Sequence, residues 1–134
     1  MDVSIITLEP ISVMYVLGER GKSIPEQSHE SFKLLESKLK SLKGRKFYGA
    51  EHNGVYRACV AINSELDEQP LPHPHWIIPG GRYARVKIRD WERNAQQIPE
   101  VFSELCQRKD YDADRSLIEY YRSQRELVLM APIK

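Results

Sequence analysis

Two stretches of the chain carry apolar residues at steps of three and four, the period of an amphipathic helix. The first apolar stripe lies within residues 32–42 and the second within residues 98–106. Ser23 and Glu26 have the spacing of a capping box, in which each side chain binds a free amide of the first turn. We therefore expect the first helix to begin after Ser23 and to end near Gly44.

Other stretches are rich in β-branched and aromatic residues, which favours strands. The clearest has strict alternation: Ala84, Val86 and Ile88 are expected in the core, while Tyr83 and the intervening basic residues are expected to face water. The strands predicted in this way are residues 3–8, 11–17, 45–50, 55–62, 83–90, 116–121 and 126–133.

The order strand, helix, hairpin occurs twice along the chain. Ile-Pro-Glu occupies residues 24–26 at the first helix and residues 98–100 at the second, and Asn53-Gly54 favours a tight hairpin turn. We therefore predict a single α+β domain over residues 1–134, built as tandem duplicated β-α-β-β units with pseudo-twofold symmetry. The expected form is an antiparallel sheet with two helices on one face and a ligand cleft at the seam. Repeat one would cover about 1–66, a connection about 67–75, and repeat two about 76–134.

Composition narrows the classes of partner. The 134 residues include 41% hydrophobic and 29% charged residues, which is typical of a globular domain. The formal net charge of +1 gives no general attraction to nucleic acid or to anionic membranes, so neither is an expected partner. Cys59 and Cys106 lack redox or metal spacing, and no signal peptide or apolar membrane span is evident, which favours reduced thiols and a cytoplasmic protein.

Motifs for metals and cofactors are weak. Residues 110–114 begin like a calcium loop, but Arg115 stands where glycine is required and Tyr121 where glutamate is required. His73 and His75 have no third ligand at a suitable spacing. No phosphate-binding loop, zinc-protease motif or serine-hydrolase elbow occurs, so we expect no metal and no cofactor.

Glu119 is the strongest candidate for a functional residue. It lies between apolar neighbours in a predicted strand and shares its face with Leu117 and Tyr121. A buried carboxylate is retained only if it is paired, protonated or completed by a ligand, so the position indicates cation binding or proton transfer. In the alternative interpretation, Ile118 and Tyr120 face inward and Glu119 makes an edge strand soluble.

Aromatic residues could complete a site around Glu119. Trp91 follows a strand and precedes a helix, where its indole could stack on a flat or cationic ligand or could instead fill the core. Tyr48 lies in the first repeat at the position equivalent to the Glu119 strand. Tyr15 and Tyr83 are further candidates, although aromatic residues of strands more often belong to a core.

Three segments together carry a family resemblance: Ile-Ile-Pro-Gly-Gly-Arg-Tyr-Ala at 77–84, Ile-Glu-Tyr-Tyr at 118–121 and Ala-Pro-Ile at 131–133. The chain resembles, over nearly its whole length, the GyrI-like small-molecule-binding domains, which are related to effector-binding domains of AraC-type and MerR-type multidrug regulators. The resemblance implies a duplicated β-α-β-β fold with an aromatic cleft between the repeats and a buried glutamate, which in several family members faces lipophilic cations. Glu119 and Tyr121 match that glutamate and its companion tyrosine.

The resemblance leaves three functions open. The chain could be a stand-alone binding protein for a small organic ligand. It could be a hydrolase of cyclopropane-containing toxins, with Glu119 and Tyr121 as catalytic residues, or a gyrase-inhibitor-like protein-interaction module. The related regulators carry a separate DNA-binding domain, for which two repeats leave no room, so direct nucleic-acid binding is not expected. A protein partner and a monomeric or dimeric state remain open.

Overall fold

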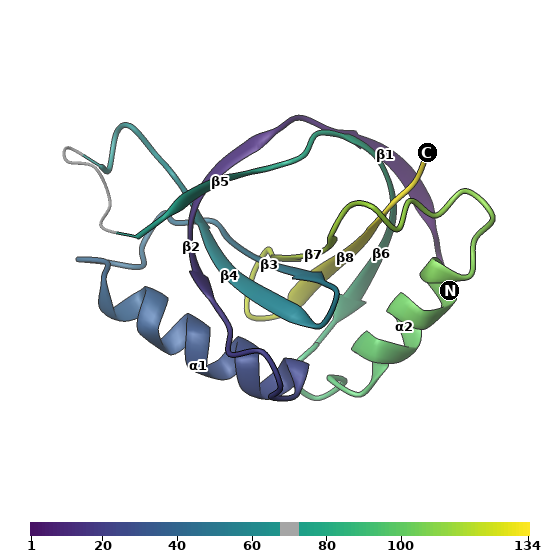
Figure 1. Cartoon of the computed structure of the whole chain (residues 1–134), viewed down its shortest axis with the longest axis horizontal. Helices are drawn as coiled ribbons and strands as arrows, with labels where there is room; N and C mark the ends of the chain where they lie inside the picture. Colours follow the sequence, from purple (N-terminus) through teal and green to yellow (C-terminus); the bar gives the residue numbers. More distant parts are fainter. Residues whose placement is uncertain (68–72) are drawn as a thin grey trace. The chain divides into compact units, whose positions relative to one another are not determined.

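The computed structural model describes residues 1–67 and 73–134. Its backbone divides into two units, each containing one helix and four strands (Figure 1). The N-terminal unit is Ile11–Ile78, and the C-terminal unit combines Met1–Pro10 with Pro79–Lys134. The α+β class with antiparallel strands and two helices is therefore confirmed. The symmetry and the seam cleft expected from the repeat remain predictions.

The N-terminal unit has the strand order β3-β4-β2-β5, and every neighbouring pair is antiparallel. Helix α1 covers one face of this sheet, packing on a core that includes Met14, Val16, Tyr56, Ala58 and Val60. These core residues come from alternating positions of two strands, as expected for a sheet with one covered face. The elements are β2 (Ile11–Leu17), α1 (Ile24–Ser37), β3 (Phe47–His52), β4 (Val55–Ala61) and β5 (His75–Ile78).

The C-terminal unit has the strand order β1-β6-β8-β7, again with antiparallel pairing. Helix α2 packs on the apolar face formed by Ala84, Val86, Ile88, Leu127 and Leu129, so the core face predicted for residues 83–90 is confirmed. The elements are β1 (Ser4–Leu8), β6 (Gly81–Arg89), α2 (Gln97–Cys106), β7 (Leu117–Tyr121) and β8 (Glu126–Pro132).

Strands β1 and β5 belong to units that their position in the sequence does not suggest. Strand β1 precedes β2 in the chain but pairs with β6, whereas β5 precedes β6 but pairs with β2. Expected repeat one, about 1–66, therefore contains a strand that packs with the C-terminal unit. Strand β5 was not predicted. Much of the expected connection, residues 68–72, lies outside the described residues.

Helix α1 begins where the sequence predicted and ends earlier. The Ser23 Oγ accepts a hydrogen bond from the Glu26 amide at 3.2 Å, which confirms the cap. The helix ends at Ser37, so the predicted end near Gly44 is wrong. Ser37 Oγ donates to the Leu34 carbonyl at 2.6 Å, and the Lys38 and Leu39 amides bind carbonyls three residues back. Side-chain bonding and a tightened last turn compete with continuation of the helix.

Tyr83 departs from the predicted alternation of β6. It lies on the face expected to meet water, yet it is fully buried. Its hydroxyl donates to the Pro79 carbonyl at 2.6 Å, and the Arg115 guanidinium lies 5.0 Å from its ring centroid. The expectation of a wet position is wrong because Arg115 and the preceding turn cover the ring.

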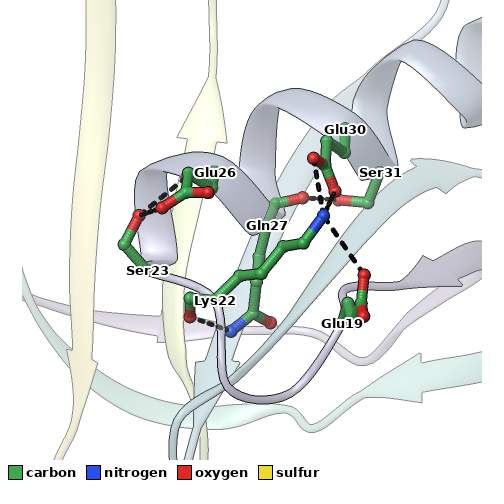
Figure 2. A network of polar contacts seen from close by, with 7 residues as sticks. All are labelled: Glu19, Lys22, Ser23, Glu26, Gln27, Glu30 and Ser31. Atoms are coloured by element: carbon green, nitrogen blue, oxygen red, sulfur yellow. Dashed lines mark hydrogen bonds and ion pairs between the residues drawn. The ribbon is translucent and has the colours of Figure 1, made fainter.

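A buried glutamine connects α1 to the loops around it. Gln27 is fully buried; its Nε2 donates to the Lys22 and Gly54 carbonyls, and its Oε1 accepts from the Tyr56 amide, each at 2.9 Å. Figure 2 shows the Lys22 bond beside the ion pairs of Lys22 with Glu19 and Glu30. The Asn53-Gly54 turn has φ of 53° and 80°, as the predicted tight hairpin requires. No helix in the described part of the chain is long and apolar enough to cross a membrane.

Candidate functional site

Glu119 lies on the face of the C-terminal sheet that α2 covers. In the β7–β8 register Glu119 is opposite Leu129 and Tyr121 is opposite Leu127. Directly opposed residues share a face of the sheet, and both leucines belong to the core beneath α2. Glu119 is only 8% exposed, which does not fit an edge carboxylate that serves solubility.

Tyr121 contacts this carboxylate, and Trp91 packs on Tyr121. The Tyr121 hydroxyl donates to Glu119 Oε1 at 2.9 Å. The Trp91 ring meets the Tyr121 ring edge to face, with centroids 5.4 Å apart and an angle of 71° between planes. Trp91 Nε1 donates to the Ser123 carbonyl at 3.2 Å, which fixes the indole orientation. Both rings are partly exposed, whereas Glu119 is buried.

The arrangement of Glu119, Tyr121 and Trp91 suits two kinds of chemistry, cation binding and proton transfer. A carboxylate removed from water is stabilised by hydrogen-bond donors and by positive charge, which suits it to hold a cation. The negative faces of Tyr121 and Trp91 attract the same kind of ligand through cation–π interaction. The hydrogen bond between Tyr121 and Glu119 also provides a route along which a proton could move.

Of the other predicted site residues, one lies in the C-terminal unit and two lie in the N-terminal unit. Tyr83 is on the opposite face of the C-terminal sheet from Glu119, because it alternates with Ala84 of the α2 core. Tyr15 and Tyr48 belong to the N-terminal unit, where both are opposite Cys59 in the strand register and therefore share one face. The structure thus brings together Glu119, Tyr121 and Trp91, and it separates Tyr83 from them.

Sequence reasoning missed an arginine on the same face as Tyr15. The Arg57 guanidinium lies 5.3 Å from the Tyr15 ring centroid and 4.9 Å from that of Trp76. Arg57 Nε is buried and has no hydrogen-bond partner among the described residues. The sequence did offer one signal for Arg57 as a candidate: it is a cationic residue between Tyr56 and Ala58 in an otherwise apolar strand.

Two hollows of similar size occur in the N-terminal unit. One, of about 370 Å³, includes Tyr48 and the basic residues Arg45 and Lys46 in its lining. The other, of about 360 Å³, includes Arg57. Glu119 does not line either of these two hollows.

Ion pairs account for the acidic run that resembles a calcium loop. Asp110 binds Arg108 at 2.9 Å and Asp112 binds Arg115 at 3.0 Å. These hydrogen bonds to arginine hold the pKa of both carboxyl groups below the usual range. Asp112 Oδ1 also accepts from the Asp114 amide at 3.1 Å, so the run is organised by its own side chains and backbone.

Comparison with known proteins identifies relatives by fold. No family model matches the chain. No curated protein matches it either. Among the solved structures that match are three that are similar over almost the whole chain. An integron cassette protein from the mobile metagenome of Vibrio cholerae has a TM-score of 0.69 at 14% identity, covering 98% of this chain and 95% of that one.

Two further solved structures match this chain with similar TM-scores. A candidate bacterial transcription regulation protein from Staphylococcus aureus has a TM-score of 0.68 at 12% identity, covering 100% of this chain and 99% of that one. SAV2435, solved bound to tetraphenylphosphonium, has a TM-score of 0.66 at 14% identity, covering 100% of this chain and 94% of that one. At these identities the likeness establishes that the chain shares their fold.

Proposed function

We propose that the chain is a binding protein for small lipophilic organic cations, with Glu119 as the charge-pairing residue and Tyr121 and Trp91 as aromatic contacts. One observation carries the proposal: a carboxylate only 8% exposed accepts the hydroxyl of a half-buried tyrosine that packs against a half-buried tryptophan. Aromatic surface around a buried negative charge is complementary to an organic cation with apolar substituents.

Two further facts support this choice of ligand. Residues 77–84 and 118–121 resemble GyrI-like domains, in several of which the matching glutamate faces lipophilic cations. One protein of the same fold was solved with tetraphenylphosphonium, which is such a cation. We extend both observations to this chain as a GyrI-like domain, related to regulator effector-binding domains.

The test uses two ions of matched shape and opposite charge. Tetraphenylphosphonium and tetraphenylborate are titrated by calorimetry into the wild-type chain and into Glu119→Gln. We expect binding of the cation only, weakened about tenfold or more by Glu119→Gln, because a desolvated ion pair is lost. Glu104→Gln is the matched control, since Glu104 is exposed on α2. Equal affinity of wild type and Glu119→Gln for the cation would refute charge pairing.

The Tyr121 to Glu119 hydrogen bond of 2.9 Å favours a second candidate, hydrolysis of cyclopropane-containing electrophiles. Glu119 would accept a proton from water as the water oxygen bonds to a ring carbon. The ring carbon–carbon bond would break and its electron pair would pass to the electron-accepting group of the substrate. Glu119 would then return its proton to the resulting anion, which restores the carboxylate for another turnover. Tyr121 would orient the carboxylate.

Chromatography of such an electrophile, before and after incubation, separates the two candidates. Multiple turnovers that disappear in Glu119→Gln would assign an enzyme. Stoichiometric binding with the compound recovered intact would assign a binding protein. Tyr121→Phe keeps the ring and removes the hydroxyl, so it should weaken turnover far more than cation binding.

A further inference from the structure

The hollow that includes Arg57 lies on the face of the N-terminal sheet that α1 does not cover. Arg57 alternates in β4 with Tyr56 and Ala58, which pack under α1, so its side chain emerges on the other face. Leu17 is opposite Arg57 in the β2–β4 register and shares that face. The lining residues of this hollow, called here the Arg57 hollow, are Leu17, Gly18, Arg20, His52, Asn53, Val55 and Arg57.

The guanidinium of Arg57 is held in place by aromatic rings. It is 4.9 Å from the Trp76 centroid and 5.3 Å from the Tyr15 centroid, and these two rings meet edge to face with centroids 6.5 Å apart. Contacts with two rings restrict the rotamers of a long side chain, so little further entropy is lost when a ligand binds. The Arg57 Nε is buried and has no hydrogen-bond partner among the described residues, so at least this donor is not used within the described part of the chain.

The charged side chains that line the Arg57 hollow are all positive. Arg20 and Arg57 are its charged lining residues, and none of the described residues that line it is acidic. The Arg20 guanidinium donates to the Asn53 carbonyl at 3.3 Å, which holds it at the rim beside the hairpin turn. Two guanidinium groups around one hollow with no lining carboxylate favour an anionic ligand.

The walls of the Arg57 hollow are positioned by the buried Gln27. Gly18 and Asn53 come from two different loops, and Gln27 binds the carbonyl of Gly54 in one and that of Lys22 in the other. Figure 2 shows Gln27 reaching from α1 to the loop that carries Lys22. A β-carbon on Gly18 would lie 2.5 Å from Gln27 Oε1, so glycine is needed for this close approach. The hollow therefore has preorganised walls.

We infer that the Arg57 hollow binds a small organic carboxylate. Arg57 would donate from its planar guanidinium to the carboxylate oxygens, and Arg20 would add a second charge at the rim. Leu17 and Val55 provide apolar surface for the body of the ligand, and a volume of about 360 Å³ suits a small organic molecule more than a bare inorganic ion. This inference is independent of the proposed role of Glu119, which belongs to the other unit.

Nuclear magnetic resonance on the full chain tests the inference directly. Benzoate, the neutral isostere benzamide, and inorganic phosphate are titrated while the Arg57 Nε–H and the amides of Gly18 and Asn53 are followed. We expect benzoate to shift these three resonances in a saturable manner and benzamide to leave them unchanged. Shifts caused by phosphate alone, or by benzamide as strongly as by benzoate, would overturn the assignment. No shift with any of the three would also overturn it.

Variants separate binding from folding. Arg57→Gln should weaken benzoate binding about tenfold or more, and Arg57→Lys should recover only part of it, because lysine cannot donate in a bidentate manner. Arg20→Gln at the exposed rim should weaken binding without changing the thermal midpoint. Arg89→Gln, an exposed arginine of β6, is the matched control. Unchanged affinity in Arg20→Gln and Arg57→Lys would refute the inference, even if Arg57→Gln fails to fold.

Discussion

Replacing Gln27 by leucine should destabilise the chain strongly, although leucine has a similar size and is apolar. Gln27 is fully buried and makes three hydrogen bonds of 2.9 Å, to the Lys22 carbonyl, the Gly54 carbonyl and the Tyr56 amide. Leucine provides neither donor nor acceptor, so all three backbone groups lose this partner. The perturbation therefore removes polar contacts while it largely preserves packing volume.

The magnitude follows from the burial of the three groups. Tyr56 is only 1% exposed, so its amide would lose a partner that water cannot replace, at a cost of about 2 kcal/mol. Lys22 and Gly54 lie in exposed or half-exposed loops, where water can reach the carbonyls, so each costs about 0.5 kcal/mol. The sum is about 3 kcal/mol, a large part of the stability of a small domain.

Urea unfolding followed by tryptophan fluorescence measures this cost. With an m-value of about 1.5 kcal/mol/M, a loss of about 3 kcal/mol lowers the midpoint by about 2 M. Gln124→Leu is the matched control, because Gln124 is exposed in the β7–β8 turn and its replacement should change the free energy of unfolding by less than about 0.5 kcal/mol. A Gln27→Leu midpoint equal to that of the control would refute the reasoning.

Two further predictions concern ionisation. The hydrogen bond from Arg45 holds the pKa of Asp67 below its usual value, so Asp67 stabilises the folded chain above pH about 4, and this contribution is lost as pH falls through the folded pKa. Asp67→Asn should therefore lower the urea midpoint at pH 7, and this effect should shrink as pH falls below about 4. An effect that does not change with pH would contradict the ion pair. Burial raises the pKa of the Cys59 thiol to about 12. This thiol should therefore resist an aromatic disulfide reagent at pH 8 until urea unfolds the chain. Cys106 is partly exposed and should react first. Two equally fast thiols in the native chain would contradict this burial.

Local chemistry was sufficient to predict several elements. The Ser23 cap, the Asn53-Gly54 turn and the buried face of β6 depend on contacts between residues near in sequence or on strict alternation. The pattern around Glu119 also indicated a desolvated carboxylate, and its partner Tyr121 lies two residues away on the same strand. These features could be predicted because the interacting groups are separated by few residues.

Other features required contacts between residues far apart in the chain. Alternation placed Tyr83 in water, but Arg115 covers it. Arg57 became a candidate only when Trp76 and Tyr15, from two other strands, were found against its guanidinium.

The sequence by itself determined both helices and seven of the eight strands in the described part of the chain, the α+β class and the identity of one candidate carboxylate, because hydrophobic period, caps and turns act over a few residues. The tertiary structure alone decided that β1 pairs with β6, that β5 pairs with β2, and that a guanidinium lies between aromatic rings. Strand pairing and cation–π contact depend on which distant segments meet. A periodic pattern in the sequence does not specify which segments these are.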